Sequence, residues 1–312
     1  MIASAVRGLP LLISVGSLFA IAAFGQEKAG KPGTTPTADA LEPSASPDSP
    51  PPPPATPAPV VETAKPALRG AMVRLSDFGT DDVAYLSIPD SPPVAAVVLV
   101  PGMWGLDDWI KLSADRLARQ GFVALAVDLF NGQVPTDARI ASDLERGLRG
   151  ESTFRVIRAG IRFVRESPRF RTDRVALMGW EIGAGFVLEM LLTEKGIDAG
   201  VLFYGPLELD RGKLAKLKVP VCGIYGDRDP SIPREELLRF TKIVEEEHKP
   251  FDLHVFPAGT SFADPRSAGF DPVSAEAAWN MAAHFLDHHL AESVSSKKDG
   301  GWRDLFRMSE KK

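Results

Sequence analysis

The segment formed by residues 175–186, VALMGWEIGAGF, combines a glycine-rich turn pattern with an acidic side chain at its centre. An apolar run ends at Gly179, Gly183 and Gly185 open a second apolar run, and Glu181 lies between them. A Gly-x-nucleophile-x-Gly pattern is typical of a strand-to-helix turn that presents a nucleophile, because the bend leaves no room for a Cβ at the flanking positions. The nucleophile is expected to be Ser or Cys, which can form the alkoxide or thiolate that attacks a carbonyl. Glu181 therefore raises the question of whether this turn still supports acyl transfer.

Short apolar runs alternate with amphipathic stretches over residues 70–291. Continuous apolar runs of this length indicate strands buried on both faces, and the first stretch has the pattern of a hairpin. Strand–helix alternation predicts an α/β domain whose mainly parallel sheet is covered by helices on both faces. The predicted hairpin covers residues 71–89, and the buried strands cover 95–102, 122–128, 174–180, 198–205, 219–227 and 251–259. The predicted helices cover residues 106–121, 152–167, 233–247 and 272–290. Functional side chains are expected in the loops that follow the strands, where ligands bind in open sheets of this kind.

The first 25 residues are typical of a targeting segment. Arg7 supplies a short positive region, residues 9–24 form an apolar run, and Ala23 and Gly25 are small enough for a cleavage site. The apolar run is shorter than the roughly 20 residues that a spanning helix needs, which favours cleavage over anchoring. We therefore expect an exported protein, periplasmic or extracellular, that contacts a membrane only if residues 1–25 are retained.

Two further segments differ in composition from the predicted domain. Residues 26–69 are rich in Pro, Ala, Ser and Thr, with almost no large apolar side chains, so we expect a disordered and partly polyproline linker. Residues 292–312 form a charged C-terminal tail. Trp302 and Leu305 give this tail a weak amphipathic pattern, which leaves open its use as an interaction module.

The overall composition excludes several classes of function. The formal net charge of the 312 residues is −5, whereas a nucleic-acid-binding protein needs a basic face to meet phosphates. The single cysteine excludes an internal disulfide and any metal site built from several cysteines. The pocket carboxylates considered below are too few and too generic to indicate a cation site, so we predict neither a metal nor an organic cofactor.

Five segments, in this order and at this spacing, resemble the dienelactone hydrolase family of α/β-hydrolases. The resemblance covers almost all of the predicted domain and implies the α/β-hydrolase fold and the hydrolysis of lactones and carboxylic esters. The segments are residues 101–132, the turn at 179–185, and residues 202–207, 223–233 and 254–279.

The resemblance also implies four functional positions, which this chain fills unusually. The family uses a Cys or sometimes a Ser nucleophile, a His base, an Asp, and a further Glu that controls the thiol. Asp229, in the turn GDRDP, keeps the position of the acid. Glu181 occupies the position of the nucleophile, and Thr260 occupies that of the base. Gly102 stands where the further Glu is expected.

An imidazole is missing from the position where a proton would have to be transferred. A carboxylate cannot replace the attacking Ser or Cys, and without the imidazole no group of suitable pKa takes and returns the proton. His254 lies about six residues before the required loop, or roughly 20 Å along a strand, and His248 lies in a helix-to-strand connection. The remaining histidines, in the last predicted helix, are His284, His288 and His289. We expect none of the five to act as the base.

Other parts of the predicted pocket are retained. The backbone amides of Ile182 and Met103 should still form an oxyanion hole, because backbone donors survive side-chain changes. The large aromatic side chains expected to line the pocket are Trp104, Trp180 and Phe262. Glu181 itself could pair with a nearby cation, for which Arg228 and Lys111 are the candidates.

These features leave two main hypotheses open. The first is a binding or scaffold domain, carried on the proline-rich linker, in which the triad no longer works. Its ligand would be a small ester, a lactone or an anion. The second is a working ester or lactone hydrolase with a rearranged site, in which Glu181 and Asp229 act on the substrate or on a water molecule.

Overall fold

The structure is a computed structural model that describes residues 67–170 and 172–291. The predicted targeting segment, the predicted C-terminal tail and all but the last three residues of the predicted linker lie outside these described residues. Among the helices that the structure describes, none is both long enough and apolar enough to cross a membrane.

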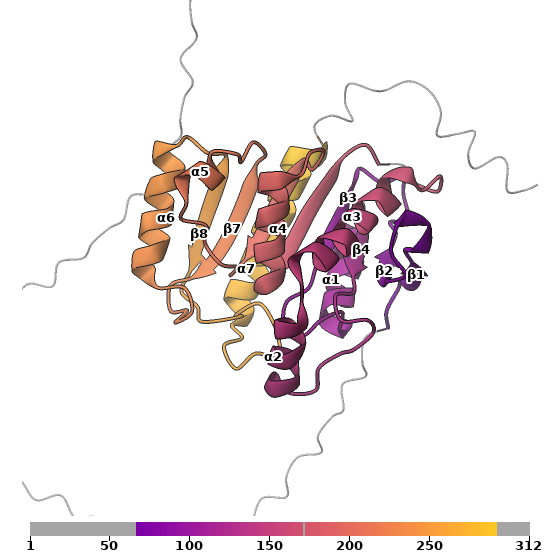
Figure 1. Cartoon of the computed structure of the whole chain (residues 1–312), viewed down its shortest axis with the longest axis horizontal. Coiled ribbons are helices and arrows are strands. Elements are labelled where there is room, and N and C mark those ends of the chain that lie inside the picture. Colours follow the sequence, from indigo (N-terminus) through magenta and orange to yellow (C-terminus); the bar gives the residue numbers. More distant parts are fainter. Residues whose placement is uncertain (1–66, 171, 292–312) are drawn as a thin grey trace, which may run out of the picture. The chain divides into compact units, whose positions relative to one another are not determined.

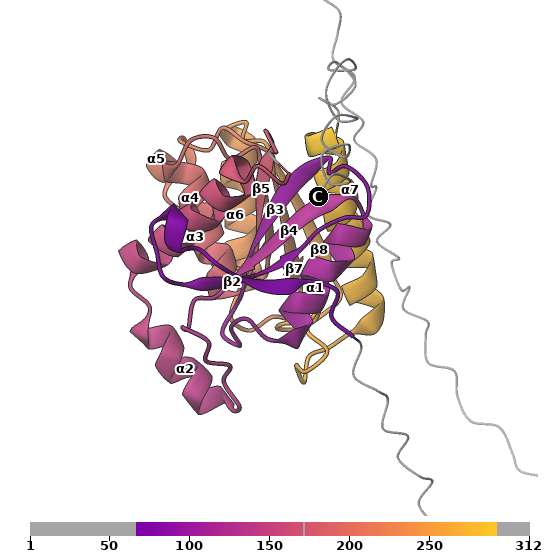
Figure 2. The ribbon, with the colours of Figure 1, turned by 90° about the vertical axis from the view of Figure 1, so that its right-hand side faces the viewer.

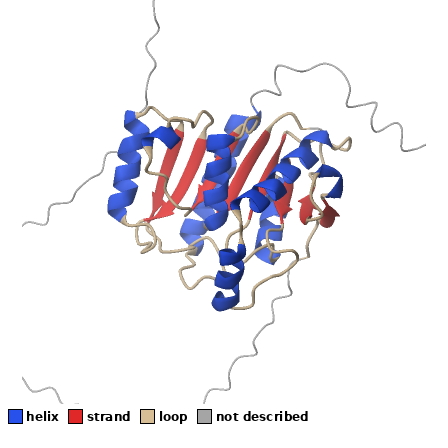
Figure 3. Ribbon diagram, viewed as in Figure 1, coloured by secondary structure: helices blue, strands red, loops and turns tan. Residues whose placement is uncertain are grey.

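One eight-stranded sheet forms the centre of the domain (Figures 1 and 3). The strands lie in the order β1-β2-β4-β3-β5-β6-β7-β8; β2 pairs antiparallel with β1 and β4, and all other pairs are parallel. The strands are β1 (Ala71–Arg74), β2 (Val83–Ser87), β3 (Ala95–Val100), β4 (Phe122–Val127), β5 (Val175–Trp180), β6 (Ala199–Phe203), β7 (Val221–Gly226) and β8 (Phe251–Phe256). The predicted hairpin and the predicted parallel sheet are thus confirmed.

Helices cover both faces of this sheet, as the strand–helix alternation predicts. Helices α1 and α7 pack on one face, and α3 and α4 pack on the other (Figure 2). The helices are α1 (Asp108–Arg119), α2 (Ala138–Gly147), α3 (Gly150–Glu166), α4 (Ile182–Thr193), α5 (Arg211–Leu214), α6 (Arg234–Glu246) and α7 (Pro272–Ala291), with a short 3-10 helix η1 (Ser76–Phe78).

The position of a strand in the sheet decides how far it is buried. All six residues of the central strand β3 are fully buried, because β4 and β5 flank it and helices cover both of its faces. Strand β8 lies at the edge next to β7 alone, and none of its residues is fully buried. The prediction of a buried strand over residues 251–259 was therefore right about the strand and wrong about its burial.

Helix α2 was not predicted from the sequence. Asp137 caps its start by accepting a hydrogen bond from the Ile140 amide at 2.9 Å. Only Ala141 of its ten residues is buried. Ile140, Ala141 and Leu144 nevertheless lie at helical spacing, so the apolar pattern of this helix was present in the sequence and was missed.

The turn between β5 and α4 brings the first turn of α4 against the end of β3. A Cβ on Gly183 would lie 2.3 Å from the Pro101 carbonyl oxygen and 2.4 Å from that of Val100. Because these neighbours are backbone atoms, they cannot move aside as a flexible side chain would. Gly183 is thus required for the close approach that places residue 181 at the edge of the sheet.

We expect Gly183→Ala to destabilise the protein by about 3 kcal/mol, because the added methyl group forces α4 away from β3. Gly147→Ala is the matched control. A Cβ there would meet nothing within 4 Å, and the change should be neutral or stabilise α2 by up to about 1 kcal/mol. Urea unfolding of both variants and the wild type measures these differences. A Gly183→Ala protein as stable as the wild type would contradict the close packing of α4 on β3.

Candidate active site

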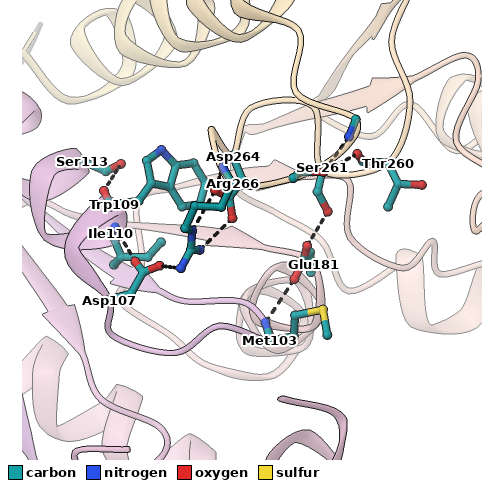
Figure 4. A network of polar contacts seen from close by, with 12 residues as sticks. Met103, Asp107, Trp109, Ile110, Ser113, Glu181, Thr260, Ser261, Asp264 and Arg266 are labelled. Carbon is teal, nitrogen blue, oxygen red and sulfur yellow. Dashed lines mark hydrogen bonds and ion pairs between the residues drawn. The ribbon is translucent and has the colours of Figure 1, made fainter. Parts of the chain in front are cut away.

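The predicted functional residues gather at the carboxyl ends of the parallel strands. Met103 follows β3, Glu181 follows β5, Asp229 follows β7 and Thr260 follows β8. Ligands of open parallel sheets bind at this edge. Figure 4 shows the contacts that join these loops.

Glu181 occupies the strained position at the tip of the turn. Its backbone has φ 52° and ψ −124°, and it directly precedes Ile182, the first residue of α4. A side chain held at a positive φ of this kind costs about 1–3 kcal/mol. Tyr204 and Ser261, which lie next to Glu181, also have positive φ values of 40° and 51°. Backbone strain is thus concentrated around the side chain of Glu181.

The carboxylate of Glu181 binds one of the two donors predicted for the oxyanion hole. Its Oε2 accepts a hydrogen bond from the Met103 amide at 3.1 Å, and its Oε1 accepts one from the Ser261 hydroxyl (Figure 4). The Met103 amide is one of the two backbone donors that the sequence suggested for a substrate oxyanion. In this structure it binds a negative charge that belongs to the protein itself.

Gly102 makes room for this arrangement. A Cβ on residue 102 would lie 2.6 Å from Oε2 of Glu181, which is closer than non-bonded contacts allow. The absence of a side chain at Gly102 and the presence of a carboxylate at Glu181 are therefore sterically linked. The family Glu expected at position 102 and the Glu at position 181 could not both occupy this space.

Asp229 is bound by hydroxyl groups in place of an imidazole. Its Oδ1 accepts hydrogen bonds from the Thr260 hydroxyl at 2.8 Å and from the amide and hydroxyl of Ser231 at 2.9 and 2.5 Å. The side chain is 5% exposed, and Oδ2 has no hydrogen-bond partner. Thr260 thus contacts the acid from the position expected of the base, but its hydroxyl is neither protonated nor ionised near neutral pH and cannot act as a general base.

In the part of the chain that the structure describes, the hydrogen bonds of Glu181 and Asp229 involve no histidine. His254 pairs with Asp252 at 2.9 Å within the edge strand β8. His289 stacks against Phe285 in α7, at 4.5 Å between ring centroids.

The cation near Glu181 is Arg266. Lys111 pairs with Asp108 at 3.7 Å and Arg228 pairs with Asp227 at 3.6 Å, so the expectation that either would neutralise Glu181 was wrong. The guanidinium of Arg266 interacts electrostatically with Glu181. It is held by other partners, however, and forms no hydrogen bond with the Glu181 carboxylate.

Two buried carboxylates hold Arg266 over the site. The Arg266 Nε and Nη2 donate to the two oxygens of Asp264 at 3.1 and 2.7 Å, and Nη1 pairs with Asp107 (Figure 4). The same guanidinium lies 5.4 Å from the ring centroid of Trp104. Sequence reasoning missed these residues because their roles depend on how the loop after β8 folds onto the start of α1.

Two more neighbours were missed. Burial raises the pKa of the Tyr204 hydroxyl well above its usual value, and the charge of Glu181 raises it further. Burial also raises the pKa of Glu145, with a second contribution from Glu181. Glu145 belongs to α2, so this unpredicted helix brings another acidic group near the site.

The space beside Glu181 is too small for a substrate. The cavity there has a volume of about 10 Å³ and is lined by Trp104 and Trp180, with Tyr204 and Arg266 among the other residues. A volume of this size accommodates at most about one water molecule. Phe262, the third aromatic residue proposed for the pocket, is fully buried in the core, where it packs against Tyr204 at 5.6 Å between ring centroids.

The pKa of Asp107 generates a prediction for stability. Burial raises this pKa to about 6, and the Ile110 amide and Arg266 offset only part of the effect. The folded state therefore holds the proton more tightly than the unfolded chain, so the contribution of Asp107 to stability falls as pH rises between about 4 and 6. The stability difference between wild type and Asp107→Asn should shift by about 3 kcal/mol in favour of the variant from pH 4 to pH 7.

Asn is a suitable replacement because it also caps helices well, as Asp107 does for α1. Asp90→Asn is the control, because the Asp90 side chain is 90% exposed and its pair with Arg69 should contribute little. Urea unfolding at both pH values measures the differences. A wild-type advantage that grows with pH would contradict the assignment.

Comparisons with known proteins identify the family and the fold. The sequence model of the dienelactone hydrolase family matches residues 83–290. A relative from Bradyrhizobium sp., named "Probable 2-oxo-3-(5-oxofuran-2-ylidene)propanoate lactonase", is 28% identical over 232 residues, covering 69% of this chain and 93% of the relative. "Carboxymethylenebutenolidase 1" of Cupriavidus pinatubonensis is 26% identical over 202 residues, covering 60% of this chain and 83% of the relative.

A solved structure of another protein has the same fold. The dienelactone hydrolase-like promiscuous phosphotriesterase P91 from metagenomic libraries superposes with a TM-score of 0.63 at 24% identity, over 70% of this chain and 98% of that one. The family match, which covers most of the chain, and the shared fold lead to one conclusion: this chain belongs to the dienelactone hydrolase family of the α/β-hydrolase superfamily.

Proposed function

We propose that this domain binds a small molecule without hydrolysing it by the triad route of its family. The observation that carries the proposal is the hydrogen bond from the Met103 amide to Glu181 at 3.1 Å. An oxyanion hole acts by binding the negative charge that develops on the substrate in the transition state. A fixed carboxylate in the hole competes with that charge and repels it.

The surroundings of Asp229 support the same proposal. Acyl transfer needs a group that accepts a proton from the nucleophile and returns it to the leaving group. Asp229 has the hydroxyls of Thr260 and Ser231 as partners, and both stay protonated at neutral pH. The aspartate that would orient an imidazole is retained, while the imidazole is replaced.

A rearranged hydrolase is the second candidate, and one contact favours it. The Ser261 hydroxyl donates a hydrogen bond to the carboxylate of Glu181. A serine paired with a carboxylate is a weak version of a nucleophile paired with a base, because the carboxylate is a far poorer proton acceptor than an imidazole. The small cavity at this point argues against an ester reaching Ser261.

We expect the wild-type protein to hydrolyse p-nitrophenyl acetate and a dienelactone no faster than Glu181→Ala. We also expect Glu181→Cys combined with Thr260→His to gain esterase activity, because it supplies a nucleophile and a base next to Asp229. The double variant should exceed either single variant by at least about tenfold, since a positioned general base contributes about 10²–10⁴-fold. Release of p-nitrophenol measures the rates.

Three results would contradict this view. Wild-type turnover that is lost in Ser261→Ala and in Glu181→Gln would favour the rearranged hydrolase. Turnover that survives both changes and Asp229→Ala would come from another part of the protein. A folded double variant with no gain in activity would contradict the placement of the ancestral pocket, with folding checked by circular dichroism.

The proposal includes export, which rests on sequence features alone. The apolar run and small residues near position 25, followed by the proline-rich segment, would place the domain outside the cytoplasm on a tether. Mass spectrometry of the exported fraction should give a chain that begins shortly after residue 25. A chain that keeps residues 1–25 and stays in the cytoplasm would contradict export.

A further inference from the structure

A second and larger cavity lies next to the site, on the other side of two tryptophans. It has a volume of about 360 Å³ and lies between α1 and α7, which share one face of the sheet (Figure 2). The ends of β5 and β6 contribute Trp180 and Phe203 to it. Its remaining aromatic walls are Trp109, Phe270 and Trp279.

Trp109 and Trp180 belong to both cavities. Each lines the small space beside Glu181 and also the larger cavity, and their rings meet edge-on at 5.4 Å between centroids. The two spaces are therefore separated by side chains rather than by backbone. A ligand in the larger cavity would lie beside the ancestral site without contacting Glu181.

The volume of the larger cavity fits a small organic molecule. An engineered cavity of about 150 Å³ holds benzene, and natural ligand pockets begin at about 300 Å³. At about 360 Å³ this cavity has room for two fused rings. Walls built from aromatic side chains favour a flat ring system, because stacked and edge-on ring contacts add to the burial of apolar surface.

One polar group in the wall has no partner inside the protein. Trp279 is 7% exposed, and its indole Nε1–H is buried with no hydrogen-bond acceptor. Buried donors are nearly always paired in folded proteins, so an unpaired one needs an explanation. The nitrogen is shielded from solvent and therefore from the open cavity, so the ring of Trp279 rather than its N–H forms the wall.

A positive charge lies against the same indole. The guanidinium of Arg116 lies 4.5 Å from the Trp279 ring centroid, and its Nη2 donates to Glu276 at 2.5 Å. A guanidinium carries five N–H donors, so this pairing leaves it able to bind a second carboxylate. Arg116 lines the cavity and its side chain is 36% exposed, which places the charge at the mouth of the cavity.

From these observations we propose that the cavity between α1 and α7 binds a planar aromatic carboxylate. The rings lie among Trp109, Trp180 and Phe203, and the carboxylate binds Arg116 at the mouth of the cavity. This goes beyond the proposed function, because it assigns a ligand class and a binding place separate from the cavity at Glu181.

The test is to titrate the full chain with 1-naphthoate and with its neutral analogue 1-naphthamide, by calorimetry and by ligand-detected NMR. We expect saturable binding of 1-naphthoate, tighter than that of the amide. Arg116→Gln should remove the preference for the carboxylate.

Two further variants locate the binding. Ala275→Phe should abolish it by filling the cavity that Ala275 lines. Trp104→Phe is the matched control, because Trp104 lines only the cavity at Glu181, and it should leave the affinity for 1-naphthoate unchanged. Thermal unfolding of each variant checks that it folds. If Arg116→Gln does not fold, Ala275→Phe and Trp104→Phe still test whether 1-naphthoate binds in this cavity.

Each contrary result overturns the proposal. Absence of saturable binding, or binding that survives Ala275→Phe, would rule out this cavity as the site. Equal affinity for acid and amide in the wild type would rule out the carboxylate as the recognised group. Because 1-naphthoate contains no ester, these outcomes are independent of the esterase assay that tests the proposed function.

Discussion

The hydrogen bond from the Met103 amide to the carboxylate of Glu181 is the interaction on which the rest of the site depends. Strand β5 and helix α4 meet at a strained residue, and that geometry directs the side chain at position 181 towards the end of β3. A short nucleophile at this position would leave the amide free for a substrate oxygen. The longer Glu reaches the amide itself, and the missing Cβ of Gly102 leaves space for Oε2 in this position. Glu181 thus takes up a backbone donor that could otherwise bind an anion.

The other buried acceptors of the site are also paired with hydroxyl groups. The Thr260 hydroxyl connects Asp229 to the loop after β8, in addition to the donors of Ser231. Ser261 supplies a hydroxyl to Glu181. Hydroxyls satisfy buried acceptors as well as an imidazole does, but they do not change protonation state near neutral pH. These contacts therefore hold the loops after β5, β7 and β8 together at the end of the sheet without a group that titrates near neutrality.

The parts of this structure that the sequence predicted are those fixed by local pattern. The apolar runs of β3 and β5 and the glycines around residue 181 determine strands and a turn with little help from distant residues. Helix α2 was missed although Ile140, Ala141 and Leu144 lie at helical spacing. The other errors lie where distant residues decide. The exposure of β8 follows from its place at the edge of the sheet. Arg266 replaces the cations proposed for Glu181 because the loop after β8 folds onto Asp107, a contact that spacing along the chain does not indicate.

The aromatic residues connect the closed site with the open cavity beside it. Trp109 and Trp180 narrow the space at Glu181 and, with their other edges, form the wall of the cavity between α1 and α7. Rings packed in this way resist collapse, because each is held by a further neighbour, as Trp180 is by Phe203 at 5.5 Å between centroids. The small volume at Glu181 therefore does not limit the neighbouring cavity. Since the two cavities are separated by the rings of Trp109 and Trp180, binding in the larger one requires no opening of the smaller one.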